Sequence, residues 1–230
     1  MDFYIEQAIL ERAPRTRLAV VELDGMSVGF GHENLDEMRL RVANRIRDEL
    51  RSSTALKSVP QIAGTQELLG RFDPDMRRTV TATEVLLRKV IEGGNLPVEN
   101  DALDAAALLA IYYKLPVMIS DVRDLRGPAG LVVGREGRPF DVLQGHDPIR
   151  VQGRLFLKDD IGYFASPIAP CKRALVTERT KRALLTCIFP ENVGDSILND
   201  FIRRGGNWLT SLCGGEVIVE GLVGEAETAE

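Results

Sequence analysis

Apolar residues in the first part of the chain recur at the spacing of a helix. From Asn34 they fall three or four positions apart, which predicts an amphipathic helix over residues 34–51. Arginines lie between them, and we interpret these as a solvated face, with a track for RNA as the alternative. The apolar positions are Leu35, Met38, Val42, Ile46 and Leu50, and the arginines are Arg39, Arg41, Arg45 and Arg47.

Two more helices are indicated by residues that suit helix ends. Thr81 and Glu84 have the spacing of a capping box, which predicts a helix over residues 81–93. Asn100 is a suitable N-cap for a helix over residues 101–114, whose first turn is acidic, as the helix dipole favours.

The remaining apolar segments are short and are separated by turn residues, the pattern of strands. A helix over residues 192–204, ended by Gly205-Gly206, lies among them. The expected strands are Leu18–Leu23, Val117–Ser120, the segments GLVVG, RPFDVL, IRVQ, GRLFL and IGYFA, then Ala183–Phe189 and Glu216–Val223. Helices concentrated toward the start of the chain and short antiparallel strands toward its end indicate the α+β class.

The formal charge of −5 arises at the end of the chain. The last fifteen residues hold five glutamates and no base, so the rest of the chain balances 29 acids with 29 bases. We expect residues 224–230 to be a frayed acidic tail. Overall charge therefore neither opposes nor favours an RNA partner.

Composition and motifs exclude several classes of protein. No apolar run is long enough to cross a bilayer, and the first residues do not have the order of a signal peptide, so we expect a cytoplasmic protein. Three widely spaced cysteines and two loop histidines, His32 and His146, make a metal site improbable. Motifs for nucleotide binding, zinc proteolysis and serine hydrolysis are absent, and no cofactor is predicted.

The most basic stretch is CKRALVTERTKRA, residues 171–183. Its five bases outnumber its single acid, Glu178, and two threonines lie among them. Such a segment suits a phosphate or the end of an RNA, and the alternative is a polar loop that leads into a strand. The candidate RNA-binding residues are Lys172, Arg173, Thr177, Arg179, Thr180 and Lys181.

A longer order of motifs covers residues 60–190. It runs from IAGTQELLGRF through NLPVENDALDAAALLAIYYKLPVMISDVRDLRG and GLVVGREGRPFDVL to VTERTKRALLTCIF. This order resembles the B3/B4 (tRNA-binding and editing) domain of the bacterial phenylalanyl-tRNA synthetase β subunit, and still more the stand-alone B3/B4 proteins. The resemblance implies a barrel-like, mainly antiparallel sheet with helices packed on it. It also implies a pocket that, in the synthetase, hydrolyses tyrosine wrongly attached to phenylalanine tRNA. We expect one domain over residues 1–223, with the sheet built mainly from residues 115–190.

Carried over residue by residue, the resemblance implies a pocket with altered chemistry. Its positions are Asn100, Asp104, Ala107, Met118, Asp121, Cys171 and Thr186. Asp104, Asp121, Thr177 and Thr180 match the synthetase motifs. The Thr-Asn pair of the synthetase is replaced here by Ala106-Ala107, its histidine by Met118 and its glutamate by Thr186. Losing these polar partners removes the means to recognise a tyrosine hydroxyl, so we expect weak or absent tyrosine editing. Cys171, beside two bases, is a candidate nucleophile of lowered pKa.

Two functions remain open from the sequence. One is an RNA-directed protein that binds the aminoacylated end of tRNA and, if it is an enzyme, acts as a deacylase. The other is a non-catalytic module that binds an amino acid or other small metabolite in the barrel pocket. Bases that share one face with the pocket favour RNA, and scattered bases favour the small ligand.

Overall fold

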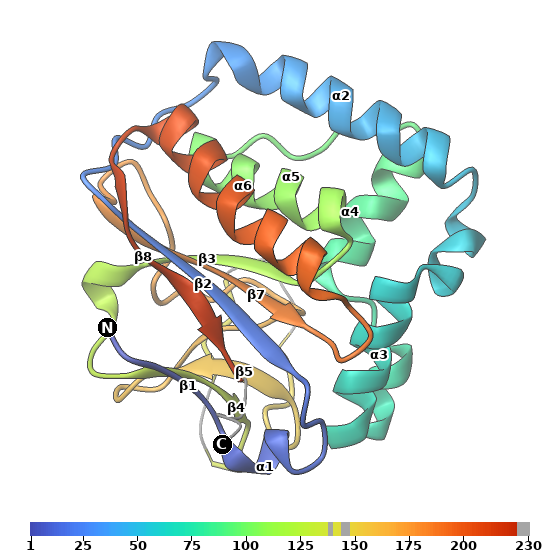
Figure 1. The fold of residues 1–230 in the computed structure, drawn as a ribbon, viewed down its shortest axis with the longest axis vertical. Helices are drawn as coiled ribbons and strands as arrows, with labels where there is room; N and C mark the ends of the chain where they lie inside the picture. Colours follow the sequence, from blue (N-terminus) through green and yellow to red (C-terminus); the bar gives the residue numbers. More distant parts are fainter. Residues whose placement is uncertain (138–139, 144–147, 225–230) are drawn as a thin grey trace.

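The helices and sheets are stacked in layers (Figure 1). The computed structural model describes residues 1–137, 140–143 and 148–224, so His146 and the acidic tail from residue 225 lie outside it. α2 (Glu33–Glu49) is outermost and covers a layer of three helices, which in turn covers a sheet. The three helices are α4 (Ala82–Ile91), α5 (Asp101–Tyr113) and α6 (Asp195–Cys213). α3 (Pro60–Phe72) runs along one side of the stack.

The strands of the described residues form two four-stranded sheets. The first has the order β3-β7-β2-β8 and is antiparallel throughout: β3 (Val117–Asp121), β7 (Arg182–Phe189), β2 (Arg17–Asp24) and β8 (Glu216–Val223). The second has the order β1-β4-β5-β6, and only β1 pairs in parallel: β1 (Phe3–Ile5), β4 (Ala129–Val133), β5 (Leu155–Lys158) and β6 (Tyr163–Ala165). The α+β class is thus confirmed. Both sheets are open over the described residues, and a closed barrel is not found among them.

β2 is buried on both of its faces. Ala19, Val21 and Leu23 pack into the core shared with the helices, whereas Leu18 and Val20 pack into the core between the sheets. Burial on both sides explains why this strand reads as a continuous apolar run. β2 and β8 confirm the expectation that the two ends of the chain contribute strands to the core sheet.

The helix caps follow the sequence closely. The Thr81 hydroxyl accepts from the Glu84 amide at 3.3 Å, and the Glu84 carboxylate accepts from the Thr81 amide, completing the predicted capping box. Asn100 accepts from the Leu103 amide at 3.0 Å and so caps α5 as predicted. His32 accepts from the Asn34 amide and caps α2.

The last helix does not end at Gly205-Gly206, so that prediction is wrong. α6 continues to Cys213, and Gly214, with a φ of 65°, follows its end. A Cβ on Gly205 would lie 2.7 Å from the Leu185 side chain, and one on Gly206 2.9 Å from that of Val217. The glycine pair therefore allows α6 to approach the sheet closely instead of stopping the helix.

Some short elements also differ from the prediction. IRVQ forms no strand, and the described part of RPFDVL contributes a single bridge, between Val142 and Cys171. The structure adds β1 and α1 (Gln7–Leu10) near the start of the chain. It also adds three short 3₁₀ helices: η1 (Ser53–Ser58), η2 (Pro74–Arg78) and η3 (Val122–Asp124).

Candidate nucleic-acid interface

The basic segment forms a loop ahead of β7, and this loop is fastened to the end of β3. The Asp121 amide donates to the Ala174 carbonyl at 2.9 Å. The Thr180 hydroxyl donates to the Asp121 carboxylate at 2.6 Å and accepts from the Thr177 amide at 3.0 Å. Asp121 and Thr180 are both buried. These residues therefore hold the loop in place, and Thr180 offers no free hydroxyl to a ligand.

Asn100 ties the same loop to the helical layer. While its side-chain oxygen caps α5, its nitrogen donates to the Val176 carbonyl at 3.1 Å. The structure thus brings Asn100 and Asp121, predicted pocket positions, and Thr180, a predicted RNA contact, to one loop. Their polar groups are already used in internal hydrogen bonds.

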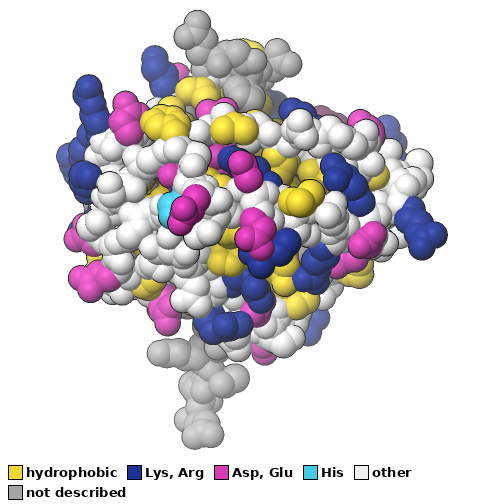
Figure 2. All heavy atoms as spheres, turned by 90° about the horizontal axis from the view of Figure 1, so that it is seen from above, with side chains coloured by type: hydrophobic (Ala, Val, Ile, Leu, Met, Phe, Trp, Pro, Cys, Tyr) yellow, Lys and Arg dark blue, Asp and Glu magenta, His cyan; other side chains and the backbone are white. Residues whose placement is uncertain are grey.

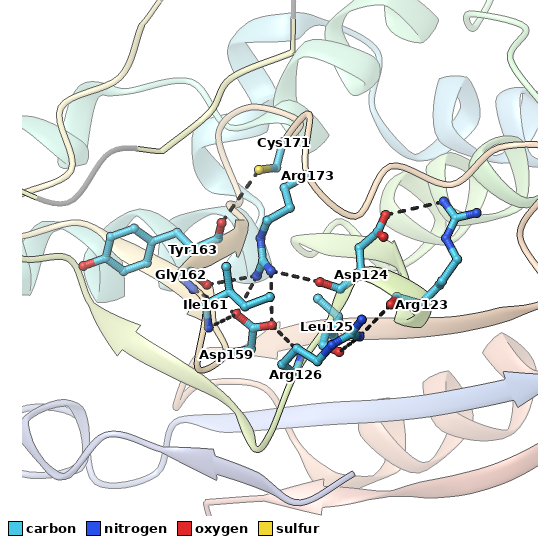
Figure 3. Close-up of polar contacts among 10 residues, drawn as sticks. All are labelled: Arg123, Asp124, Leu125, Arg126, Asp159, Ile161, Gly162, Tyr163, Cys171 and Arg173. Carbon is cyan, nitrogen blue, oxygen red and sulfur yellow. Dashed lines mark hydrogen bonds and ion pairs between the residues drawn. The ribbon is translucent and has the colours of Figure 1, made fainter.

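A buried carboxylate fixes the beginning of the loop (Figure 3). Asp159, with a fully buried side chain, accepts from the Arg173 guanidinium at 2.6 and 3.2 Å and from the Arg126 amide at 2.7 Å. Arg173 donates further to the carbonyls of Asp124 and Gly162. Arg173, a predicted RNA contact, is therefore engaged inside the protein.

The hydrogen bonds around Asp159 decide its protonation. Burial alone would raise the pKa of this carboxyl. The Arg173 guanidinium and the amides of Gly162 and Arg126 outweigh burial and hold its pKa below the ordinary value. Asp159 therefore stays ionised at neutral pH and neutralises Arg173.

Five bases project to solvent from η3, the turn after it and the loop. We call Arg123, Arg126, Lys172, Arg179 and Lys181 the basic surface, since all five are exposed. Among the described residues, Lys172, Arg179 and Lys181 have no acidic partner within ion-pair distance, and Arg126 donates only to backbone carbonyls. Arg123 lies 3.5 Å from the Asp124 carboxylate. Asp121 and Asp159 are buried beneath the surface, whereas Glu178 of the loop is exposed.

Other predicted pocket positions lie in separate parts of the core. Asp104 pairs with Arg39 of α2 at 2.5 Å, and burial raises its pKa despite bonds from the Glu99 amide and Arg39. Met118 and Thr186 face each other across β3 and β7 and are buried. Ala106 is buried in the helical core and Ala107 is half-buried. Asp104, Met118 and Thr186 are buried and so do not join the exposed bases, although Met118 packs in the same core cluster as Ala174 of the loop.

Cys171 does not have the environment of a reactive thiol. It is buried against aromatic side chains, and its thiol donates to the Tyr163 carbonyl at 3.9 Å. Burial raises the pKa of the Cys171 thiol, with Arg173 opposing it less strongly. The expectation of a lowered pKa at this residue is wrong, because burial outweighs the lowering effect of Arg173.

Neither a metal-ligand cluster nor a membrane-spanning helix occurs among the described residues. Within residues 1–137, 140–143 and 148–224, no group of three His, Cys, Asp or Glu side chains is arranged to hold a metal ion. In the same part of the chain, no helix is both long and apolar enough to span a membrane.

Comparisons with known proteins gave distant similarity to solved structures only. No family model matches the chain, and no curated protein matches it. Among solved structures, the chain is similar to an N-terminal fragment of the phenylalanyl-tRNA synthetase β subunit from Pyrococcus horikoshii, with 12% identity and a TM-score of 0.46. The match covers 96% of this chain and 50% of that fragment, so the chain spans about half of its length.

Proposed function

We propose that this chain is an RNA-binding protein of the B3/B4 type, a single domain over residues 1–223. Its basic surface would bind the backbone near the aminoacylated end of a tRNA. The observation that carries the proposal is the convergence of five exposed bases on two adjoining segments, whose acids are the buried Asp121, the half-exposed Asp124 and the exposed Glu178. Lysine and arginine side chains placed in this way suit phosphate groups.

The anchoring of the loop supports this role. Asn100 and Asp121 donate to backbone carbonyls of the loop, and Asp159 holds the Arg173 side chain, so the bases project from a segment that is already ordered. Binding then costs less conformational entropy than it would for a free loop. Because the remainder of the chain before its acidic end is electrically neutral, affinity should be modest and should fall steeply with salt.

The same contacts weigh against the small-ligand alternative. A pocket for an amino acid needs convergent polar groups that are free to bond the ligand. The polar atoms of Asn100, Asp121 and Thr180 are instead engaged in hydrogen bonds that hold the loop. Met118 and Thr186 are packed in the core.

We further propose binding without efficient ester hydrolysis. No predicted position supplies a nucleophile of lowered pKa, since burial raises the pKa of Cys171. Thr186 and Met118 provide neither a carboxylate nor an imidazole to act as a base. Incubation with a panel of mischarged tRNAs should therefore release the amino acid no faster than buffer does. Rapid deacylation of tyrosine-charged phenylalanine tRNA would refute this part.

Binding itself is tested with a labelled tRNA at low salt, followed by fluorescence anisotropy. A triple variant, Lys172→Ala, Arg179→Ala and Lys181→Ala, should bind every tRNA at least about tenfold more weakly, because each lost phosphate contact weakens binding without regard to sequence. The matched control removes three exposed bases elsewhere, Arg51→Ala, Lys57→Ala and Arg78→Ala, and should bind as the wild type does. Equal losses in both triples, or no binding by the wild type, would contradict the proposal.

A further inference from the structure

A groove lined by arginine and aromatic side chains lies between α2, α5 and α6. Its volume is about 290 Å³. The face of the molecule over α2 shows Lys and Arg side chains gathered with acidic and apolar ones between them (Figure 2). The groove is lined by Met38, Arg41, Val42, Arg45, Tyr112, Arg204 and Trp208.

Aromatic rings and guanidinium groups are stacked in this groove. The Arg45 guanidinium lies 4.3 Å from the centre of the Tyr112 ring, and that of Arg204 lies 4.9 Å from it. The Trp208 ring meets Tyr112 edge-on, with 5.8 Å between centroids. Flat cationic and aromatic faces side by side are the surfaces on which proteins stack unpaired nucleobases.

The arginines of the groove differ in how firmly they are held. Arg45 pairs with Glu49 at 2.7 Å, and Arg204 pairs with Asp200 at 3.2 Å, so both are oriented by acids. Arg41 lies 3.8 Å from Glu37, and both side chains are about two-thirds exposed. An exposed ion pair of this kind contributes little, so Arg41 can turn to a phosphate at small cost.

We propose that this groove binds an unpaired nucleotide of the RNA partner. The base lies against Trp208 and the guanidinium planes of Arg45 and Arg204, and the phosphate pairs with Arg41. The inference rests on the proposed function and adds a second contact to it, one that recognises a single-stranded nucleotide. An acidic peptide would satisfy the charges but would leave the flat faces without a stacking partner.

The chain offers a direct probe, because Trp208 is its single tryptophan. A stacked base quenches indole fluorescence, so emission reports occupancy of this groove alone. Titration with single-stranded oligoadenylate should quench Trp208, with an affinity that falls as salt rises. Polyglutamate at matched charge should leave the emission unchanged.

Two variants, one within α2 and one just after its end, provide the matched comparison. Arg41→Glu should weaken the quenching by about tenfold or more, since it removes a phosphate contact and adds repulsion. Arg51→Glu makes the same charge change at an exposed residue outside the groove and should have no effect on it. Thermal unfolding of both variants at the wild-type temperature shows that neither has lost its fold.

The outcomes separate this inference from the proposed function. Loss of tRNA binding in the basic-surface triple variant, with no Trp208 quenching by oligoadenylate, would overturn the groove and leave RNA binding standing. Equal quenching in Arg41→Glu and wild type, or quenching by polyglutamate, would also overturn the groove. Absence of any tRNA binding by anisotropy would overturn both.

Discussion

Replacement of Asp159 by asparagine tests the role given to Arg173. The substitution keeps the size of the side chain but removes its charge. It also presents an NH₂ group among donors, because Asp159 accepts from Arg173 and from the amides of Arg126, Ile161 and Gly162. Arg173 is then left as a mostly buried, uncompensated cation.

The size of the effect follows from the burial of the pair. The Asp159 side chain is 0% exposed and that of Arg173 is 20% exposed. Removing one partner of a buried pair costs about 3–5 kcal/mol, and the partial exposure of Arg173 places the expected loss near the lower end of that range. For a chain of this size each kcal/mol lowers Tm by roughly 2–4 °C, so the variant should melt about 6–12 °C below wild type.

The pH dependence of that difference provides a second readout. Asp159 has a lower pKa in the folded protein than in the unfolded chain, so its contribution is fully present above the unfolded value of about 3.9 and is lost as the pH falls through the folded value. The difference in Tm between Asp159→Asn and the wild type should therefore become smaller at acidic pH. Asp160→Asn changes an exposed neighbour and serves as the control. An Asp159→Asn protein that melts within about 1 °C of wild type at neutral pH would refute the reasoning, because so small a shift falls below a single kcal/mol.

Three other substitutions or reactions have defined outcomes. Asn100→Ala removes both the α5 cap and the bond to Val176, and should lower the free energy of unfolding in urea by about 1–2 kcal/mol; no loss would contradict the cap. Gly130→Ala places a Cβ 2.3 Å from the Tyr4 ring, so it should lower Tm and displace Tyr4, and a wild-type Tm would count against this packing. Cys171 should be alkylated more slowly than a free cysteine at mildly alkaline pH until denaturant is added, since its raised pKa leaves little thiolate, and rapid native labelling would show that its burial is wrong.

Local signals in the sequence predicted much of the fold. The caps at Thr81 and Asn100 were predicted because a cap is decided within one helical turn. The continuation of α6 through Gly205-Gly206 was missed because it depends on how closely the helix meets β7 and β8, which no local pattern reveals. The barrel was expected from the resemblance alone, and the strands found are two open sheets.

The candidate site was predicted in part. The sequence indicated the loop and its bases but wrongly suggested that Arg173 is available to bind RNA. The partner of Arg173, Asp159, is identified only by tertiary contact. Arg123 and Arg126 were missed, although a signal for them existed. They follow directly after β3, and the antiparallel pairing of β3 with β7 places the end of one strand beside the start of the other.

The salt dependence of tRNA affinity tests the central claim most directly. The logarithm of the association constant should fall linearly with the logarithm of salt concentration, with a slope set by the number of phosphates contacted. Replacing Lys172, Arg179 and Lys181 with alanine should reduce that slope by about 2–3, since each phosphate contact contributes roughly 0.7–0.9. A wild-type slope near zero, or a slope that the triple variant leaves unchanged, would contradict an interface built on the basic surface.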